Sequence, residues 1–343
     1  MRHTGDGVTK RRCCSRVRHL VAVILALSLS VAASHIAAQP TGKVYHVGLL
    51  GTREGPTTPA FRQGLRELGY AEGRNIALTY RWSDGRAERF PALAAELVNL
   101  KVDVLVASGP PAALAAKAAT AAIPIVFTFV GDPVGLGLVS SLARPGGNVT
   151  GFASLVEAGP FTQKQLELFK EMVPRATRVA VLRNPGNPME ALGPGSLAHT
   201  MAAADKLGLK IQILDARTPE EIDRAFETAT QGRAEAIHVH GDVLFGLHRA
   251  RIVALAATHR LPALYLTSEN VLAGGLMSYG PNANDLLRRT AGHVDKILKG
   301  AKPADLPVEQ PTKFDLFINL KTARALALPV PASLLLRSDH IVE

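Results

Sequence analysis

The chain has 343 residues, which is long enough for two domains. It is 47% hydrophobic, 20% charged and only 5% aromatic, which excludes a disordered chain and favours α/β layers over an all-β sandwich. The formal net charge is +10, but basic and acidic residues are interspersed along the mature chain, without a basic stripe that carries aromatic residues. A nucleic-acid partner is therefore not expected.

Residues 1–38 are predicted to be a secretion signal that is removed. A basic segment over residues 10–18 precedes an apolar run over residues 20–33, which is too short for a spanning helix of about 20 residues. An uncleaved membrane anchor is the alternative. Cys13 and Cys14 both precede the apolar run, so we expect no disulfide, thiolate or Cys-ligated metal in the mature protein. The pattern predicts a periplasmic protein with no membrane insertion after cleavage.

Short apolar runs alternate with amphipathic stretches along the first part of the mature chain. Strands are predicted over residues 44–50, 75–82, 103–107 and 123–129, and helices over residues 57–69, 87–100, 110–120 and 134–143. Residues 144–148, with a proline and two glycines, are predicted to form a loop. The strands 103–107 and 123–129 are apolar without alternation, which is typical of a sheet that is covered on both faces.

The same rhythm begins again after residue 160. Strands are predicted over residues 178–182, 210–214, 236–240 and 263–266, and helices over residues 161–173, 189–207, 219–230 and 244–259. Thr218 and Glu221 have the spacing of a capping box at the start of one of these helices. Short strands that alternate with longer helices indicate parallel sheets with right-handed crossovers.

The last segment is too small to form a third domain. Residues 276–279 alternate like a strand, Gly280 and Pro281 end it, and Asn282 is expected to cap the next helix. The remaining predicted elements are a helix over residues 284–298, strands over residues 306–311 and 314–319, and a helix over residues 321–326. This segment must dock on the lobes that precede it, so the chain would cross between them more than once.

We therefore predict an α/β protein with two doubly wound parallel-sheet lobes joined by a multi-strand hinge. Ligands bind at the carboxyl ends of the strands in such sheets, so two facing lobes would place all those ends around one cleft. The predicted parts are the signal at residues 1–38, lobe 1 at residues 43–154 with 281–305, and lobe 2 at residues 155–280 with 306–343.

Polar residues that follow the predicted strands of lobe 1 are candidate ligand contacts. The hydroxyl of Ser108 and the backbone N–H groups of residues 109–111 are placed to hold a ligand carboxylate at the positive end of a helix. The alternative is an ordinary turn in which Ser108 caps the helix. Asp132 either receives a ligand ammonium group or caps the predicted helix 134–143. Trp82, the single tryptophan, either lines the cleft or packs in the core.

Lobe 2 and the hinge supply the other candidates. Asn184 follows one predicted strand and Asp242 follows another, and each either contacts the ligand or shapes a turn. Tyr279 offers an aromatic wall and a hydroxyl at the hinge, or packs there without touching ligand. We predict that Ser108, Asp132, Asn184, Asp242 and Tyr279 make the polar contacts to the ligand.

Catalytic and metal motifs are weak in this sequence. His238, His240 and Asp242 are in phase on one predicted strand, which is a conceivable metal triad, but a metal site usually needs a further converging ligand and a second shell of support. The glycine-rich run 135–140 lacks the third glycine of a dinucleotide motif, and there is no P-loop or Gly-x-Ser-x-Gly elbow. We therefore predict no metal, no cofactor and no enzyme.

Six segments together carry a family resemblance. They are residues 131–135, 141–151, 178–182, 275–280, 294–300 and 310–314. From about Val44 to Glu343 the chain resembles the ABC-transporter substrate-binding proteins of the tryptophan/tyrosine type, which look like type I periplasmic binding proteins. The chain departs from the family pattern at His238 and His240, where aliphatic residues are usual, and at Val243, where a proline often stands.

The resemblance implies that a small solute is captured and delivered to an ABC permease in the inner membrane. We expect a monomer that binds an amino acid, an aromatic compound or a small carboxylate by lobe closure. Two other functions stay open at this point. One is an exported α/β enzyme of hydrolase type, and the other is a ligand-sensing module that presents its closed form to a receptor.

Overall fold

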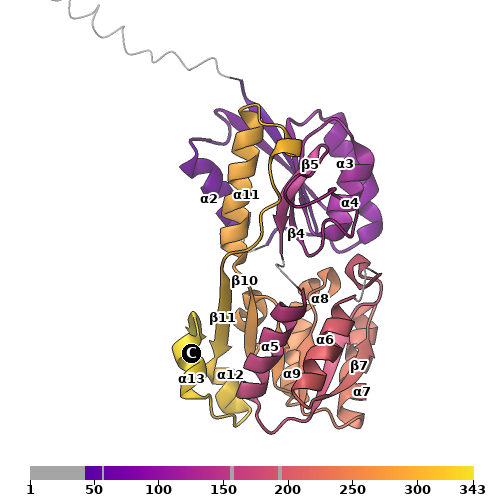
Figure 1. The fold of residues 1–343 in the computed structure, drawn as a ribbon, viewed down its shortest axis with the longest axis vertical. Coiled ribbons are helices and arrows are strands. Elements are labelled where there is room, and N and C mark those ends of the chain that lie inside the picture. Colours follow the sequence, from indigo (N-terminus) through magenta and orange to yellow (C-terminus); the bar gives the residue numbers. More distant parts are fainter. Residues whose placement is uncertain (1–42, 56–57, 155–157, 192–194) are drawn as a thin grey trace, which may run out of the picture. The chain divides into compact units, whose positions relative to one another are not determined.

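A computed structural model describes residues 43–343 except 56–57, 155–157 and 192–194, so the predicted signal lies outside the described residues. The described chain forms two separate β-sheets, each flanked by helices (Figure 1). We call each sheet with its helices a lobe. No helix within this part of the chain has both the length and the apolar character needed to cross a bilayer.

The sheet of lobe 1 is parallel throughout and has the order β2-β1-β3-β4-β5. Its strands are β1 (Tyr45–Gly51), β2 (Ile76–Trp82), β3 (Val104–Ser108), β4 (Ile125–Val130) and β5 (Val149–Ala153). The associated helices are α2 (Thr58–Glu67), η2 (Ala87–Arg89), α3 (Phe90–Asn99), α4 (Pro110–Ala119) and α11 (Ala283–Leu298). The direction of winding reverses between β1 and β3, and this switch point is where doubly wound sheets bind ligands.

The sheet of lobe 2 has the order β12-β11-β10-β9-β8-β6-β7. Its strands are β6 (Arg178–Arg183), β7 (Lys210–Asp215), β8 (Ala236–Val239), β9 (Ala263–Tyr265), β10 (Met277–Pro281), β11 (Phe314–Asn319) and β12 (His340–Val342). All pairs are parallel except β10 with β11. The winding reverses between β6 and β8, so lobe 2 has a switch point of its own.

The helices of lobe 2 lie in the crossovers and in the tail. They are α5 (Ala158–Met172), η3 (Pro188–Ala191), α6 (Gly195–Lys206), α7 (Pro219–Gln231), α8 (Val243–Leu247), α9 (Arg249–Thr258), α10 (Ser268–Leu272), α12 (Leu320–Ala325) and α13 (Ala332–Arg337), while η4 (Pro303–Asp305) follows α11. The predicted cap of α7 is confirmed, because the hydroxyl of Thr218 accepts the N–H of Glu221. The return bond differs from a capping box, since the Glu221 carboxylate accepts the N–H of Arg217 and not that of Thr218.

Each sheet separates two apolar cores, which explains the continuous apolar strands. Phe61 packs on one face of the first sheet and Phe90 on the other, and both are almost fully buried. In lobe 2, Phe169 and Phe226 occupy the corresponding positions on the two faces of the sheet. Burial of each such side chain contributes about 1.5–3 kcal/mol to folding. The predicted α/β class with two doubly wound sheets is confirmed.

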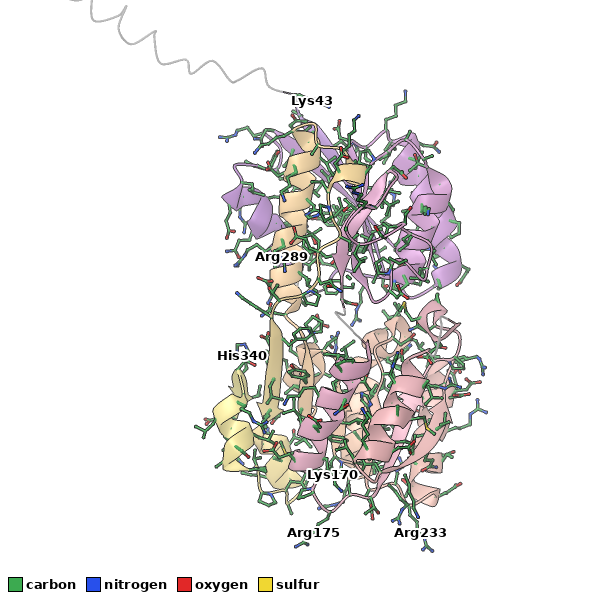
Figure 2. The ribbon with its side chains drawn as sticks, viewed as in Figure 1. Lys43, Lys170, Arg175, Arg233, Arg289 and His340 are labelled. Atoms are coloured by element: carbon green, nitrogen blue, oxygen red, sulfur yellow. The ribbon has the colours of Figure 1, made fainter. Side chains whose placement is uncertain are left out.

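The returning segment docks on lobe 1. Helix α11 lies against α2 (Figure 1) and is capped by Asn282, whose side chain accepts the N–H of Asp285 as predicted. The residues after α11 then run along β5, where Glu309 pairs with the backbone on either side of Phe152. Arg289, labelled on α11 in Figure 2, forms an ion pair with Glu309 and lies over the ring of Phe152.

Basic side chains gather at the edge of lobe 2 where its strands begin. Figure 2 labels Lys170, Arg175 and Arg233 at this edge, close to the starts of β6 and β8. The ligand-binding edge of a parallel sheet is the opposite one, where strands end. These three cations therefore lie at the edge of the sheet opposite to the one where ligands bind in parallel sheets.

Several predicted elements differ from those observed. The helix expected over residues 134–143 does not form, because Gly137 has a φ of +66° and the chain there makes turns. The helix expected over residues 244–259 is interrupted at His248, and residues 306–311 form an isolated bridge at Glu309 instead of a strand. Strand β5, with glycine at its centre, was not predicted.

Candidate functional site

A hollow of about 140 Å³ lies at the switch point of lobe 1, at the ends of β1, β2, β3 and β4. Its apolar walls are Leu49, Leu50, Phe61, Trp82, Val106, Phe129 and Leu287. Its polar side chains are Thr52, Arg53, Thr58, Ser108 and Thr128. A dry cavity of about 150 Å³ holds a benzene molecule, so this hollow has the size and the walls for one aromatic ring. The ring of Trp82 is itself stacked on Tyr80, 5.4 Å away.

Two residues with hydroxyl side chains line this hollow, one on each of two neighbouring strands. Ser108 and Thr128 are register partners on β3 and β4. The hydroxyl of Thr128 is fully buried and has no hydrogen-bond partner among the described residues. An unpaired buried hydroxyl costs about 1–3 kcal/mol, so such a group in a native protein calls for an explanation, and a functional role is one. We therefore take the Ser108–Thr128 pair as the polar centre of the hollow.

The backbone beside this pair is strained. Phe129 has a φ of +57°, a left-handed conformation that bulky residues rarely adopt. The strand pairing between β4 and β5 is irregular at the same place, between Phe127 and Val130. The strain turns the chain at the end of β4, where Phe129 forms part of the wall. Strained residues of this kind cluster at ligand sites and persist because the surrounding structure fixes them.

The turn after Ser108 is poorer in donors than expected. Gly109 donates its N–H to the carbonyl of Thr128 at 2.9 Å, and Pro110 and Pro111 have no N–H to offer. The start of α4 therefore does not form the predicted set of backbone donors. Gly109 is the N-cap and α4 has no side-chain cap, so Ser108 does not cap the helix either. Its hydroxyl is left as the group that faces the hollow.

Asp132 lies outside the hollow. Its carboxylate accepts the N–H of Gly135 at 2.8 Å and so closes a turn, while the side chain is exposed. The helix that it was expected to cap does not form. Whether Asp132 also contacts ligand stays a prediction.

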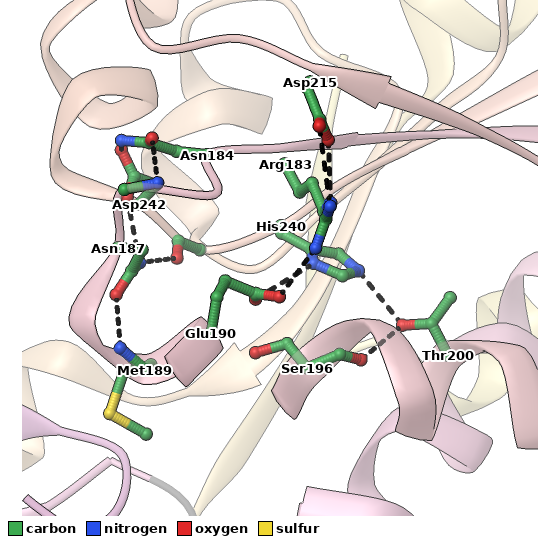
Figure 3. A network of polar contacts seen from close by, with 12 residues as sticks. Arg183, Asn184, Asn187, Met189, Glu190, Ser196, Thr200, Asp215, His240 and Asp242 are labelled. Carbon is green, nitrogen blue, oxygen red and sulfur yellow. Dashed lines mark hydrogen bonds and ion pairs between the residues drawn. The ribbon is translucent and has the colours of Figure 1, made fainter. Parts of the chain in front are cut away.

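At the switch point of lobe 2, Asn184 and Asp242 meet (Figure 3). Asn184 donates to Asp242 at 3.2 Å, and Asn187 donates to the other carboxylate oxygen at 2.8 Å. Asp242 also caps α8 by accepting the N–H of Leu244. Burial raises the pKa of Asp242, although the amides of Asn184 and Asn187 and the N–H of Leu244 oppose that shift. The predicted pair is thus brought together, and its bonds are made within its own lobe.

A second polar network lies beside it, centred on Glu190 (Figure 3). The Glu190 side chain is 8% exposed and lies 3.5 Å from Arg183, which also pairs with Asp215. Burial alone would raise the pKa of Glu190, but His240, Ser196 and Arg183 lower it overall. Glu190 is therefore a buried carboxylate that is already neutralised by its own lobe.

His240 completes this network. The hydroxyl of Thr200 donates to the carbonyl of Ser196, so it accepts from Nε2 of His240 at 3.0 Å. Nδ1 of His240 then faces Glu190 at 3.9 Å, a distance at which an ion pair forms when the imidazole is protonated.

His238 is next to His240 on the sheet face but has no comparable partners. The two rings lie 4.9 Å apart, edge to face, and Nδ1 of His238 has no hydrogen-bond partner among the described residues. Burial, followed by the nearby His240, lowers the pKa of His238 well below its usual value. Asp242 turns away to its asparagine partners, and the described chain contains no group of three or more His, Cys, Asp or Glu side chains suited to a metal ion.

Tyr279 lies in an aromatic stack at the start of the return to lobe 1. Its ring is stacked with Phe161 and Phe314 at 5.8 and 6.0 Å, and its carbonyl accepts the side-chain N–H of Gln165. Burial, with a smaller effect from Asp339, raises the pKa of Tyr279. Tyr279 does not line the hollow of lobe 1, and its predicted ligand contact stays a prediction.

Sequence reasoning missed two arginines at the strand ends. Arg53 lies in the loop after β1, lines the hollow and donates to the carbonyl of Gly246 in α8 at 3.1 Å. Arg249 begins α9 and forms an ion pair with Glu269, and its Nε is buried without a partner among the described residues. Periodicity gives no signal for either residue, because one lies in a loop and the other stands beside Arg251 in an arginine-rich run.

A further hollow, of about 170 Å³, lies between α5 and α6. Its polar walls include Gln163, His199 and Lys206. Gln163 is already bonded to Glu167 and to Lys206. This second hollow lies on a helical face, away from the strand ends. We therefore assign the site to the lobe 1 hollow.

Comparison with known proteins identifies relatives over almost all of the described chain. The family model described as ABC transporter substrate binding protein matches residues 43–342. A tyrosine-binding protein of Clostridioides difficile (strain R20291) is 27% identical over 288 residues, which cover 83% of this chain and 81% of that protein.

Two crystal structures are similar in both sequence and fold. A conserved domain protein from Vibrio cholerae is 30% identical, with a TM-score of 0.80, over 87% of this chain and all of that chain. An ABC domain from Streptococcus pneumoniae, in complex with L-Trp, is 26% identical, also with a TM-score of 0.80, over 88% of this chain and all of that chain.

Proposed function

Because this chain belongs to the ABC transporter substrate-binding protein family, we propose that it captures a small solute at its strand ends and delivers it to an ABC importer. The matched family and relatives are substrate-binding proteins and not enzymes. Function is thus the reversible binding of a solute, without chemistry on it.

The observation that carries this proposal is the hollow at the switch point of lobe 1. It combines aromatic walls with the unpaired hydroxyl of Thr128 and the hydroxyl of Ser108, which is the combination of apolar walls and few polar groups typical of small-molecule sites. Its small volume suits one part of a ligand, with the remainder reaching toward lobe 2.

The solute belongs to the class of amino acids, aromatic compounds and small carboxylates. One relative is named for tyrosine binding and another was crystallised with L-Trp, and both ligands carry an aromatic ring and a carboxylate. The walls formed by Phe61, Trp82 and Phe129 favour a ring in this chain as well.

Binding is proposed to close the two lobes on the solute. The proposed units are those predicted from the sequence, residues 43–154 with 281–305 and residues 155–280 with 306–343. The last boundary moves to the segment between Glu309 and β11, because Glu309 still bonds to β5 of lobe 1. The chain passes between the units near residues 281–283 and 310–314. Closure is stabilised only by contacts that the solute makes in the closed form and not in the open one.

Placement in the periplasm follows from the predicted signal at residues 1–38. The mature protein is proposed to be a monomer that meets an ABC permease at the inner membrane. Fractionation of cells that produce the full chain tests this: release with the periplasmic fraction, in a form shorter by the signal, is the expected result.

Calorimetry on the mature chain tests the binding function. A panel of the common amino acids, aromatic acids and short carboxylates is titrated into protein that has been unfolded and refolded to remove any bound solute. At least one member is expected to bind, and Ser108→Ala is expected to weaken it by about tenfold through loss of one hydrogen bond. Ser338→Ala is the matched control, because among the described residues the Ser338 hydroxyl bonds only to the carbonyl of Leu335. No binding by any member contradicts the proposal.

A further inference from the structure

The charges around the hollow are unbalanced. Among the described residues that line it, Arg53 is the one charged side chain. Beyond its bond to Gly246, the Arg53 guanidinium donates to no described residue. None of the described residues that line the hollow carries a carboxylate that could receive an ammonium group.

Arg249 adds a second positive charge on the side of lobe 2. Gly246 is the acceptor for Arg53 and lies three residues before Arg249. Burial lowers the pKa of Arg249, and the negative charge of Glu269 opposes that shift. The positive charge of Arg53 lowers the pKa of Arg249 further, because the two guanidinium groups repel each other. Glu269 neutralises one of these two charges, which leaves an excess of one positive charge.

The contact between these elements is close. A methyl group added to Gly85, in the loop after β2, would come within 2.3 Å of Leu247 in α8. The strand ends of lobe 1 thus meet α8, which leads directly into Arg249 at the start of α9.

Arg249 also has an unused donor. Its side chain is only 18% exposed, and its Nε is buried without a partner among the described residues. A buried guanidinium N–H gains most from a carboxylate, because a charge-assisted hydrogen bond is about twice as strong as a neutral one.

The carboxylates at the strand ends of lobe 2, unlike the Arg249 Nε, already have partners. Asp242 is bonded to two asparagine side chains and a backbone N–H, Glu190 faces Arg183, and Glu269 is paired with Arg249. A ligand ammonium would have to displace one of these internal partners. A ligand carboxylate would find free donors.

We infer that the ligand is a single-ring aromatic carboxylate, with its ring in the lobe 1 hollow and its carboxylate between Arg53 and Arg249, and that binding needs no ammonium group. This inference rests on the proposed function and narrows its solute class.

Three probes that share a phenylethyl group separate the two charged groups. They are 3-phenylpropionate, which carries only the carboxylate, L-phenylalanine, which carries both groups, and 2-phenylethylamine, which carries only the ammonium. Calorimetry is expected to show binding of 3-phenylpropionate at least as tight as that of L-phenylalanine, and no binding of the amine.

Two variants test the arginines. Arg53→Gln and Arg249→Gln are each expected to weaken the binding of 3-phenylpropionate by about tenfold to a hundredfold, because each variant loses one charge-assisted hydrogen bond. Arg251→Gln is the matched control, because Arg251 is exposed on the same helix and pairs with Asp223. Arg53 is exposed, so its variant is expected to fold even where Arg249→Gln does not.

The inference is overturned if 2-phenylethylamine binds, if L-phenylalanine binds more than about tenfold tighter than 3-phenylpropionate, or if none of the three binds. It is also overturned if Arg53→Gln binds the acid as well as Arg251→Gln does. In these cases binding of another solute from the wider panel keeps the proposed function, whereas a panel without any binder rejects both.

Discussion

Ser108 and Thr128 face the same hollow as register partners at the ends of two adjacent parallel strands. Paired residues in a sheet project from the same face, so the two hydroxyls leave the sheet together. The fold thus places two short polar groups in an otherwise apolar recess. Only one of the pair, Thr128, is fully buried, and this difference makes it the better residue for a stability test.

Thr128→Val is expected to leave the free energy of unfolding unchanged, or to raise it by about 1–2 kcal/mol, because it replaces an unpaired buried hydroxyl with a methyl group of similar size. The same variant is expected to bind ligand about tenfold more weakly. Urea unfolding and calorimetry measure the two effects.

The matched control for that variant is Thr150→Val in the neighbouring strand β5. Thr150 is also fully buried, but its hydroxyl donates to the carbonyl of Leu306 at 2.7 Å. Its loss is expected to cost about 1–3 kcal/mol by leaving that carbonyl unpaired. Equal destabilisation by both variants would show that Thr128 has a partner after all.

Acid is expected to destabilise the protein through His238. Because burial lowers its pKa in the folded state, its stabilising contribution is complete above the unfolded pKa of about 6.5 and is lost as the pH falls toward the folded value. The loss is at most about 1.4 kcal/mol for each pH unit. His238→Leu is expected to flatten the fall in unfolding free energy between pH 7 and pH 5.

The control for this pH dependence is His340→Leu, in an exposed residue of β12. Part of the slope remains in His238→Leu, because burial also lowers the pKa of His293. Unfolding curves collected at several pH values compare the three proteins. A slope in His238→Leu that equals that of the unmodified chain would rule out His238 as a source.

Asp242→Ala is expected to lower the free energy of unfolding by about 1–3 kcal/mol, because it removes the cap of α8 and leaves the amides of Asn184 and Asn187 unpaired. Asp223→Ala, which breaks an exposed pair with Arg251, is expected to cost less than about 1 kcal/mol. Loss of ligand affinity by Asp242→Ala without loss of stability would instead place its carboxylate at the ligand, as the sequence predicts.

Two substitutions at Tyr279 separate its role in packing from a contact with the ligand. Tyr279→Ala is expected to lower the free energy of unfolding by about 1–3 kcal/mol, because it removes a partly buried ring from the stack with Phe161 and Phe314. Tyr279→Phe keeps the stack and is expected to leave stability within about 0.5 kcal/mol. A fall in ligand affinity in Tyr279→Phe, measured by calorimetry, would show that the hydroxyl reaches the solute.

Much of the fold is predictable because apolar runs and caps are local signals. The buried strands β3 and β4 and the cap of α11 at Asn282 follow from such signals alone. Strand β5 is not predicted from the sequence, because its central Gly151 and the preceding glycines are typical of a loop. It is fixed instead by distant residues, since Gly151 accepts the N–H of Glu309.

The candidate site is less predictable, because a sequence pattern shows where a side chain lies along a strand but not which groups form its hydrogen bonds. Ser108 is recognisable as a strand-end residue, and it does line the hollow. Asp242 has the same sequence signature, yet its bonds are made within lobe 2. Arg53 gives no signal, since its position depends on how a loop turns after β1.

Trp82 gives the protein a built-in optical reporter. It is the single tryptophan of the chain, and it lines the hollow while it stacks on Tyr80. Its fluorescence emission therefore originates from one wall of the recess, without contributions from other tryptophans elsewhere. The arrival and departure of a solute can be timed in the unlabelled protein by rapid mixing.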